Sequence, residues 1–276
     1  MFWTRLLSGV ILLVMAFLAL GYGGIPLVGI LCLISLVAFR ELIRVMKCTG
    51  DGKRTQTPEI VGYAGIAVYY AAAYFTAKGG MDHRILLAVI LAVFLGQLFV
   101  YVLQFPKFTA QQIAGIFFSF IYAPVMLAFV FLTRELPEGF YFVWLLLICS
   151  WGTDTCAYVV GKLIGKKKIF PVLSPKKSLE GCIGGVLGAA LIGGLYGYFL
   201  IETRFPDRSV TAMIVLICVV GSLISMAGDL TASAIKRNYD VKDYGNLIPG
   251  HGGVMDRFDS MIMTAPMVYF LAAFLL

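Results

Sequence analysis

Long apolar runs, separated by short polar segments, dominate this chain. A helix that crosses a bilayer needs about 20 predominantly apolar residues, and about nine runs approach that length. We expect spanning helices over Leu6–Leu20, Ile25–Phe39, Ile60–Ala77, Ile85–Gln104, Gln111–Leu132, Phe140–Gly161, Gly181–Ile201, Val210–Leu230 and Ser260–Leu276. The pattern therefore predicts an all-α fold, a polytopic membrane helix bundle.

Composition agrees with this class. The 276 residues are 60% hydrophobic and 13% charged, whereas about a quarter of the residues in a soluble domain are charged. The net charge is +7, which in a soluble protein would suggest nucleic acid. Here the basic residues lie between apolar runs, so we expect anionic lipid headgroups or anionic substrates as partners and no nucleic acid.

The placement of the basic residues predicts the orientation. Of the 22 lysines and arginines, 17 lie in segments on the N-terminal side of the predicted bundle and 5 on the opposite side. Because basic loops stay in the cytoplasm, the N-terminus and the long loops are expected there. We divide the chain into an N-terminal membrane bundle, residues 1–139, and a catalytic membrane region, residues 140–276, with cytoplasmic loops 162–180 and 231–259.

Asp154 is the only charged residue in the run Phe140–Gly161. An aspartate at the centre of a spanning helix costs about 2.5–3.5 kcal/mol on insertion scales. Such residues usually face a polar cavity, a metal or a basic partner, although a buried structural aspartate satisfied by its neighbours is the alternative. We therefore take Asp154 as a candidate site residue.

The loop that follows is rich in lysine and serine. It contains Ser174, Lys176, Lys177 and Ser178 around a proline that stops the preceding helix. Ser178 can cap the next helix, and free N–H groups at a helix N-terminus beside lysines bind anions. The loop suits a nucleotide triphosphate or a lipid phosphate, while a purely topological basic loop is the alternative.

The end of the eighth run carries an acid and two bases. On a helix, Asp229, Ser233, Lys236 and Arg237 fall at i, i+4, i+7 and i+8, on one face. This face could hold a metal and the phosphates that the metal bridges, whereas a salt-bridged helix end is the structural alternative.

The segment Lys242–Asp259 combines glycines with two further acids. The backbone at Gly252 and Gly253 can approach a phosphate closely. Asp256 and Asp259 would share a face if a helix begins there, and carboxylates favour Mg²⁺. Lys242, His251 and Arg257 are candidate phosphate ligands in the same segment.

The stretch 233–259 resembles the signature of the phosphatidate cytidylyltransferases. That signature reads Ser-x-apolar-Lys-Arg, four residues, Lys-Asp, then a small residue, Pro-x-His-Gly-Gly and apolar-x-Asp-Arg-apolar-Asp. The matching residues are Ser233, Ile235, Lys236, Arg237, Lys242, Asp243, Gly245, Ile248, Pro249, His251, Gly252, Gly253, Val254, Asp256, Arg257, Phe258 and Asp259. Upstream, Asp154, Tyr158, Gly161 and the Ser174–Lys177 stretch also look like this family, with mild departures at Thr153 and Lys167.

The resemblance implies transfer of the cytidylyl group of CTP to phosphatidic acid, with release of pyrophosphate. It assigns catalytic roles to Asp229, Asp256, Lys236 and Arg237, and metal binding to Asp154, Asp229, Asp256 and Asp259. Substrate binding falls to Ser174, Lys176, Lys177, Ser178, Ser233, Lys242, His251, Gly252, Gly253 and Arg257. The implied cofactor is Mg²⁺, with a second cation left open.

Two other functions stay open at this point. A CTP-dependent polyprenol or lipid kinase handles the same nucleotide but releases CDP, and a transporter could use Asp154 and Asp229 as a translocation site. The expected partners are CTP, phosphatidic acid and the bilayer, and a homodimer is left open. The expected location is the inner (plasma) membrane, with the active site facing the cytoplasm.

Overall fold

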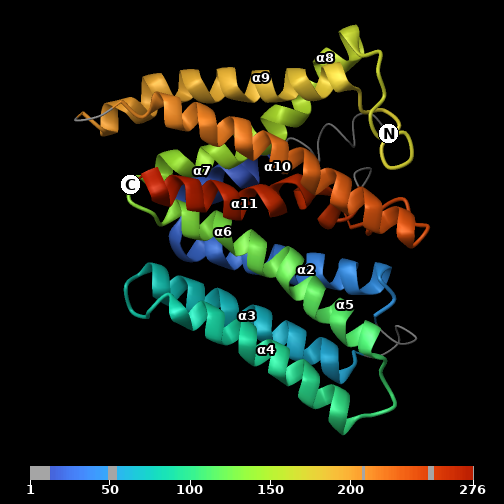
Figure 1. The fold of residues 1–276 in the computed structure, drawn as a ribbon. Helices are drawn as coiled ribbons and strands as arrows, with labels where there is room; N and C mark the ends of the chain where they lie inside the picture. Colours follow the sequence, from blue (N-terminus) through green and yellow to red (C-terminus); the bar gives the residue numbers. More distant parts are fainter. Residues whose placement is uncertain (1–12, 49–54, 207–208, 248–251, 276) are drawn as a thin grey trace. The chain divides into compact units, whose positions relative to one another are not determined.

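The computed structural model describes residues 13–48, 55–206, 209–247 and 252–275, which are almost entirely helical (Figure 1). Eight helices are long and apolar enough to cross a membrane, and a shorter apolar helix covers Leu13–Tyr22. No strand forms within the described ranges. The predicted all-α, polytopic architecture is confirmed, while part of the first predicted span, Leu6–Leu20, lies outside the described residues.

The elements follow one another along the chain as helices joined by turns and loops. They are α2 (Gly24–Val45), α3 (Thr57–Ala77), α4 (Arg84–Leu103), α5 (Ala110–Phe120), η1 (Ile121–Val125), α6 (Met126–Arg134), α7 (Gly139–Leu147), η2 (Ile148–Gly152), α8 (Thr153–Ile164), α9 (Leu179–Tyr196), η3 (Gly197–Ile201), η4 (Glu202–Arg204), α10 (Thr211–Asn238) and α11 (Met255–Leu275). Three spans are composite, because η1, η2 and η3 are single π-helical turns that continue directly into or out of an α-helix.

The chain forms two compact units. Unit 1 comprises residues 1–132 and 239–257, and unit 2 comprises residues 133–238 and 258–276. The boundary that we drew from the sequence at residue 139 remains a prediction about function.

In unit 1, α3 and α4 lie side by side (Figure 1), and α3 also packs on α2. A small residue allows each approach: a Cβ on Gly62 would lie 2.4 Å from Phe39 Cζ, and a Cβ on Gly65 would lie 2.4 Å from Val93 Cγ2. A buried polar chain also links three helical segments. Ser35 Oγ and Tyr70 Oη are 2.7 Å apart, and the Tyr70 hydroxyl donates to the carbonyl of Pro124 at 3.2 Å.

In unit 2, α9 packs against both α8 and α10. Glycines on α9 let its backbone approach α8: a Cβ on Gly181 would lie 2.8 Å from the Ala157 carbonyl oxygen, and one on Gly185 would lie 3.0 Å from that of Thr153. Close approach through small residues is the usual way in which membrane helices associate. It positions the start of α9 beside α8.

The loop predicted over residues 231–259 is shorter than expected. Helix α10 continues to Asn238, eight residues beyond the predicted end of the span at Leu230, and α11 begins at Met255 rather than Ser260. The extension contains alanine, isoleucine, lysine and arginine, which are compatible with a helix, and no glycine or proline stops it. Lys236 and Arg237 in its last turn also favour the helix dipole.

We expect Tyr70→Phe to lower the free energy of unfolding by about 1–3 kcal/mol, because it removes the hydroxyl that joins Ser35 to the Pro124 carbonyl in a buried setting. Thermal unfolding in detergent measures the change. The control is Tyr198→Phe, since that side chain is 61% exposed. Equal melting temperatures for both variants would contradict a stabilising role for the buried chain.

Candidate active site

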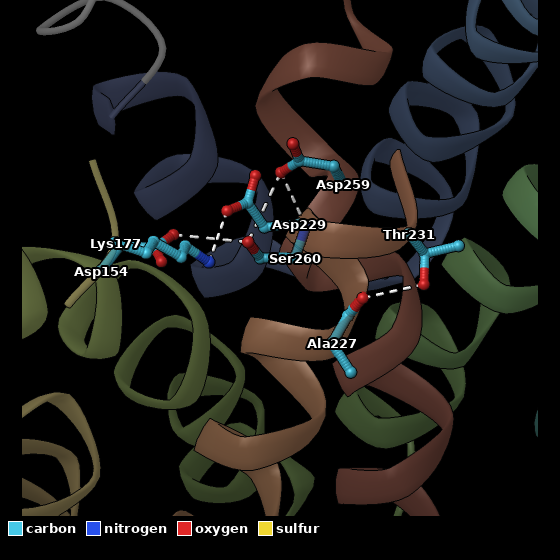
Figure 2. A network of polar contacts seen from close by, with 7 residues as sticks. All are labelled: Asp154, Lys177, Ala227, Asp229, Thr231, Asp259 and Ser260. Carbon is cyan, nitrogen blue, oxygen red and sulfur yellow. Dashed lines mark hydrogen bonds and ion pairs between the residues drawn. The ribbon is translucent and has the colours of Figure 1, made fainter. Parts of the chain in front are cut away.

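Three aspartates of unit 2 gather around one lysine and one serine (Figure 2). Lys177 Nζ lies 2.5 Å from Asp229 Oδ2. The Ser260 hydroxyl lies 3.3 Å from Asp154 Oδ2 and 3.4 Å from Asp259 Oδ1, and its single hydrogen can serve one of them at a time. Three carboxylates with a cation among them form an environment that favours positive charge.

The carboxylates act on one another electrostatically. Asp229 lies close enough to interact with both Asp154 and Asp259. Lys177 offsets part of this repulsion at Asp154, and Lys236 offsets part of it at Asp259. Like charges held close in a partly desolvated place are costly unless a cation neutralises them. The cluster is therefore poised to take further positive charge.

The position of Asp229 depends on its neighbour Gly228. A Cβ on Gly228 would lie 2.8 Å from the carbonyl oxygen of Asp259 and 3.2 Å from the Cα of Ser260. Helices α10 and α11 thus approach to backbone contact one residue before Asp229. Because Gly228 has no side chain, α10 and α11 can come close enough for Asp229 and Asp259 to interact.

Lys177 reaches the cluster from the loop that precedes α9. Ser178 caps this helix, since its Oγ accepts the N–H of Gly181 at 3.2 Å, as the sequence predicted. Ser178 is only 2% exposed, so the cap occupies its hydroxyl. The cap holds the adjacent Lys177 in place, whereas Lys176 is exposed and its carbonyl accepts from Lys168 Nζ.

Glu180 closes the base of the same loop. Its carboxylate accepts the backbone N–H of Lys166 at 3.0 Å and that of Lys167 at 3.2 Å. Glu180 is not among the site residues predicted from the sequence. Its position after three consecutive lysines could have suggested an ion pair. Spacing alone does not predict that Glu180 accepts the backbone N–H groups of Lys166 and Lys167.

In unit 1, the glycine-rich loop before α11 is held by acids. Asp256 Oδ2 accepts the N–H of Tyr244 at 2.8 Å and that of Gly253 at 3.0 Å. Gly252 has φ +85°, a conformation that glycine adopts readily and other residues rarely do. The Asp256 carboxylate therefore binds both Tyr244 and Gly253, and the N–H of Gly253 is committed to it.

The remaining predicted residues divide between the two units. Ser233, Lys236 and Arg237 lie on α10 in unit 2, and their placement on one helix with Asp229 is confirmed. Asp256, Arg257 and Asp259 all lie in the first turns of α11, so the helix that we expected there does begin before Asp256. Lys242 is an exposed loop residue, Ser174 lies in the loop before α9, and His251 lies outside the described residues.

The donors of the cluster are of the kind that a hard cation prefers. Asp154, Asp229 and Asp259 offer carboxylate oxygens, the ligands that Mg²⁺ prefers. Within the described residues, no three acids, cysteines or histidines converge closely enough to bind a metal together. The ammonium group of Lys177 lies against Asp229, where a cation would compete with it.

Nearly the whole chain is similar in sequence to known proteins of one family. The model of the cytidylyltransferase family matches residues 3–275. The phosphatidate cytidylyltransferase of Bacillus subtilis (strain 168) is 32% identical over 273 residues, covering 98% of this chain and 97% of the relative. Those of Staphylococcus saprophyticus and Staphylococcus aureus (strain COL) are 29% and 30% identical, each covering 96% of both chains.

Replacing Gly228 by alanine is expected to separate α10 from α11, because the new methyl group would overlap the Asp259 carbonyl oxygen. Overpacking of this kind costs about 1–3 kcal/mol, so the melting temperature in detergent should fall. Gly29→Ala is the matched control, since a Cβ at that helical position meets nothing within 4 Å. A Gly228→Ala protein as stable as the control would refute the close approach of the two helices.

Proposed function

The chain belongs to the cytidylyltransferase family, and we propose on that premise that it transfers the cytidylyl group of CTP to phosphatidic acid, forming CDP-diacylglycerol and pyrophosphate. The observation that carries the proposal is a cluster in which Asp229 pairs with Lys177 and interacts with both Asp154 and Asp259. Such a cluster suits a reaction in which two anionic phosphates must be brought together.

The chemistry joins two phosphates. An oxygen of the phosphatidate phosphate forms a bond to the α-phosphorus of CTP, and the bond from that phosphorus to the bridging oxygen of the β-phosphate breaks, so that pyrophosphate leaves. A phosphate monoester is already largely ionised near neutral pH, so no strong general base is needed. The demands on the protein are to position the reactants and to offset their charge.

We propose that Asp154, Asp229 and Asp259 hold Mg²⁺, whose chemistry when bound is to offset negative charge on the attacking and leaving oxygens. Asp256 was predicted to join them. Its Oδ2 is engaged by two backbone N–H groups, which supports a role in shaping the loop for at least that oxygen. A second cation remains a prediction.

The basic residues would bind the phosphates. Lys236 lies close enough to Asp259 to act on it electrostatically, and Arg237, on the next position of α10, is exposed. Lys177 would be released from Asp229 when a cation binds the carboxylates, and its ammonium would then be free to bind phosphate. One lysine would thus serve the cluster in turn as counter-ion and as phosphate ligand.

The placement in the cell follows from the same features. The protein is a multi-pass membrane protein with eight apolar helices of spanning length. We propose that it lies in the inner (plasma) membrane with the site facing the cytoplasm, because the basic loops cluster on that side and CTP is a cytoplasmic nucleotide. The acyl chains of the substrate would stay in the bilayer while its headgroup reaches the aspartates. A homodimer stays a prediction.

The activity is tested on purified protein in detergent with labelled CTP, phosphatidic acid and Mg²⁺, with an EDTA control. We expect metal-dependent CDP-diacylglycerol and pyrophosphate. Asp229→Asn and Asp259→Asn should each lower kcat by about 100-fold or more, because each removes a carboxylate that is proposed to hold the Mg²⁺ that offsets charge on the transferring phosphate. Asp82→Asn, an exposed acid that pairs with Arg84, is the control.

Two results would count against this assignment. Release of CDP together with phosphorylation of an added polyprenol would identify a lipid kinase instead. Folded protein with no turnover of either kind would reject both enzymes and favour transport.

The two adjacent lysines should differ. Lys177→Met is expected to lower kcat/KM by about tenfold or more, because the ammonium group that lies at the cluster and is proposed to bind a substrate phosphate is lost. Lys176→Met should change it much less, because that side chain is exposed and only its carbonyl has a described partner in the loop. Equal losses in the two variants would mean that the loop acts through its total charge rather than through one positioned lysine.

A further inference from the structure

Glu41 is a buried acid for which the reaction as described has no use. It lies in the last turns of α2 and is 8% exposed. Its Oε1 accepts the N–H of Val254 at 3.1 Å, and its Oε2 accepts the N–H of Met255 at 2.8 Å. Both oxygens of one carboxylate are therefore engaged by consecutive backbone groups more than 200 positions away in the sequence.

These two N–H groups belong to the beginning of α11. The first N–H groups of a helix have no partner within it, and a nearby side chain usually satisfies them. Here the partner comes from a distant helix instead, and its negative charge also suits the positive end of the helix dipole. Glu41 therefore serves as a remote N-terminal cap for α11.

The loop before α11 is shaped to admit this carboxylate. A Cβ on Gly245 would lie 2.4 Å from Glu41 Oε1, and a Cβ on Gly253 would lie 2.5 Å from Oε2. A side chain at either position would expel the carboxylate. Gly245 and Gly253 thus make room for the carboxylate, whereas the sequence predicted that the backbone at Gly253 would approach a phosphate.

Two acids together hold the loop. Glu41 accepts the N–H groups of Val254 and Met255, while Asp256 accepts those of Tyr244 and Gly253. The two carboxylates act on each other unfavourably, and Arg44, one turn further along α2, acts favourably on Glu41. A buried charge is tolerated only where hydrogen bonds and opposite charges compensate its desolvation, so these four N–H groups and the two acids require one another.

We propose that Glu41 is a positioning residue, which fixes the start of α11 against Gly245 and Gly253 in the arrangement that the reaction needs. Helix α11 carries Asp256, Arg257 and Asp259 in its first turns, so the residue at which it begins sets the direction of each side chain. The effect on turnover rests on the proposed function, whereas the effect on the loop does not.

The first test is hydrogen exchange followed by mass spectrometry over the start of α11. In Glu41→Gln, the side-chain NH₂ would face one of the two N–H groups in place of an acceptor. Exchange at Val254 and Met255 should become about tenfold faster or more. Glu59→Gln is the matched control, since Glu59 is also buried in unit 1 at 6% exposure but its carboxylate accepts from Gln56 N. Unchanged exchange at Val254 and Met255 would overturn the anchoring.

The second test is kinetic, on the same two variants in the cytidylyl-transfer assay. We expect Glu41→Gln to lower kcat by about tenfold or more relative to Glu59→Gln at similar melting temperatures, because misplaced groups react poorly. Glu41→Asp keeps the charge and should recover part of both the protection and the rate. It also carries the test if Glu41→Gln does not fold. Faster exchange with unchanged kcat would leave Glu41 a structural anchor only and would overturn its positioning role.

The wild-type protein separates this proposal from the proposed function. If it forms no CDP-diacylglycerol while the exchange results are as expected, the reaction is wrong and the anchoring stands. If it forms the product and Glu41→Gln behaves like Glu59→Gln in both tests, the reaction stands and the role of Glu41 falls.

Discussion

The need to compensate each charge within apolar helices governs this molecule. Asp154, Asp229 and Asp259 lie on helices that are otherwise long and apolar, and each would be costly alone in that setting. In unit 2, Lys177 compensates the charge of Asp229, and the Ser260 hydroxyl can donate to Asp154. In unit 1, Glu41 is compensated by backbone N–H groups. The residues that we assign to the reaction lie at these compensated charges.

Glycine makes such compensation possible by bringing backbones close together. Gly228 brings α10 against α11, Gly181 brings α9 against α8, and Gly245 and Gly253 close the loop onto a carboxylate. At each place a methyl group would meet another atom at less than 3.0 Å. The glycines are thus part of the electrostatic design, because charges are effective partners only at short range.

Most of the architecture could be predicted from the sequence because apolar runs of spanning length have few other uses. The family resemblance assigned Asp154, Asp229, Asp256 and Asp259 to one metal site, and the structure brings Asp154, Asp229 and Asp259 close enough to interact. Their partners were not predictable, because Lys177 and Lys176 are equivalent in a linear reading and only the capped geometry at Ser178 distinguishes them. Metal binding and the individual site roles stay predictions.

Glu41 was missed because the predicted end of the second apolar run was placed too early. We ended the second apolar run at Phe39, so Glu41 counted as part of a basic loop and drew no attention. The helix continues to Val45, which places an acid inside a span, the same signal that identified Asp154. The limits of α10 and α11 were also misjudged, since a helix that extends beyond the bilayer is governed by helix propensity rather than by hydrophobicity.

The ion pair between Lys177 and Asp229 also bears on how the protein is made. Chains are synthesised from the N-terminus, so Lys177 and the helix start that holds it emerge from the ribosome before Asp229 does. The lysine that pairs with Asp229 is therefore already synthesised when α10 follows it. The cost of placing this acid on an apolar helix is offset by a partner from the chain itself, which needs no bound substrate.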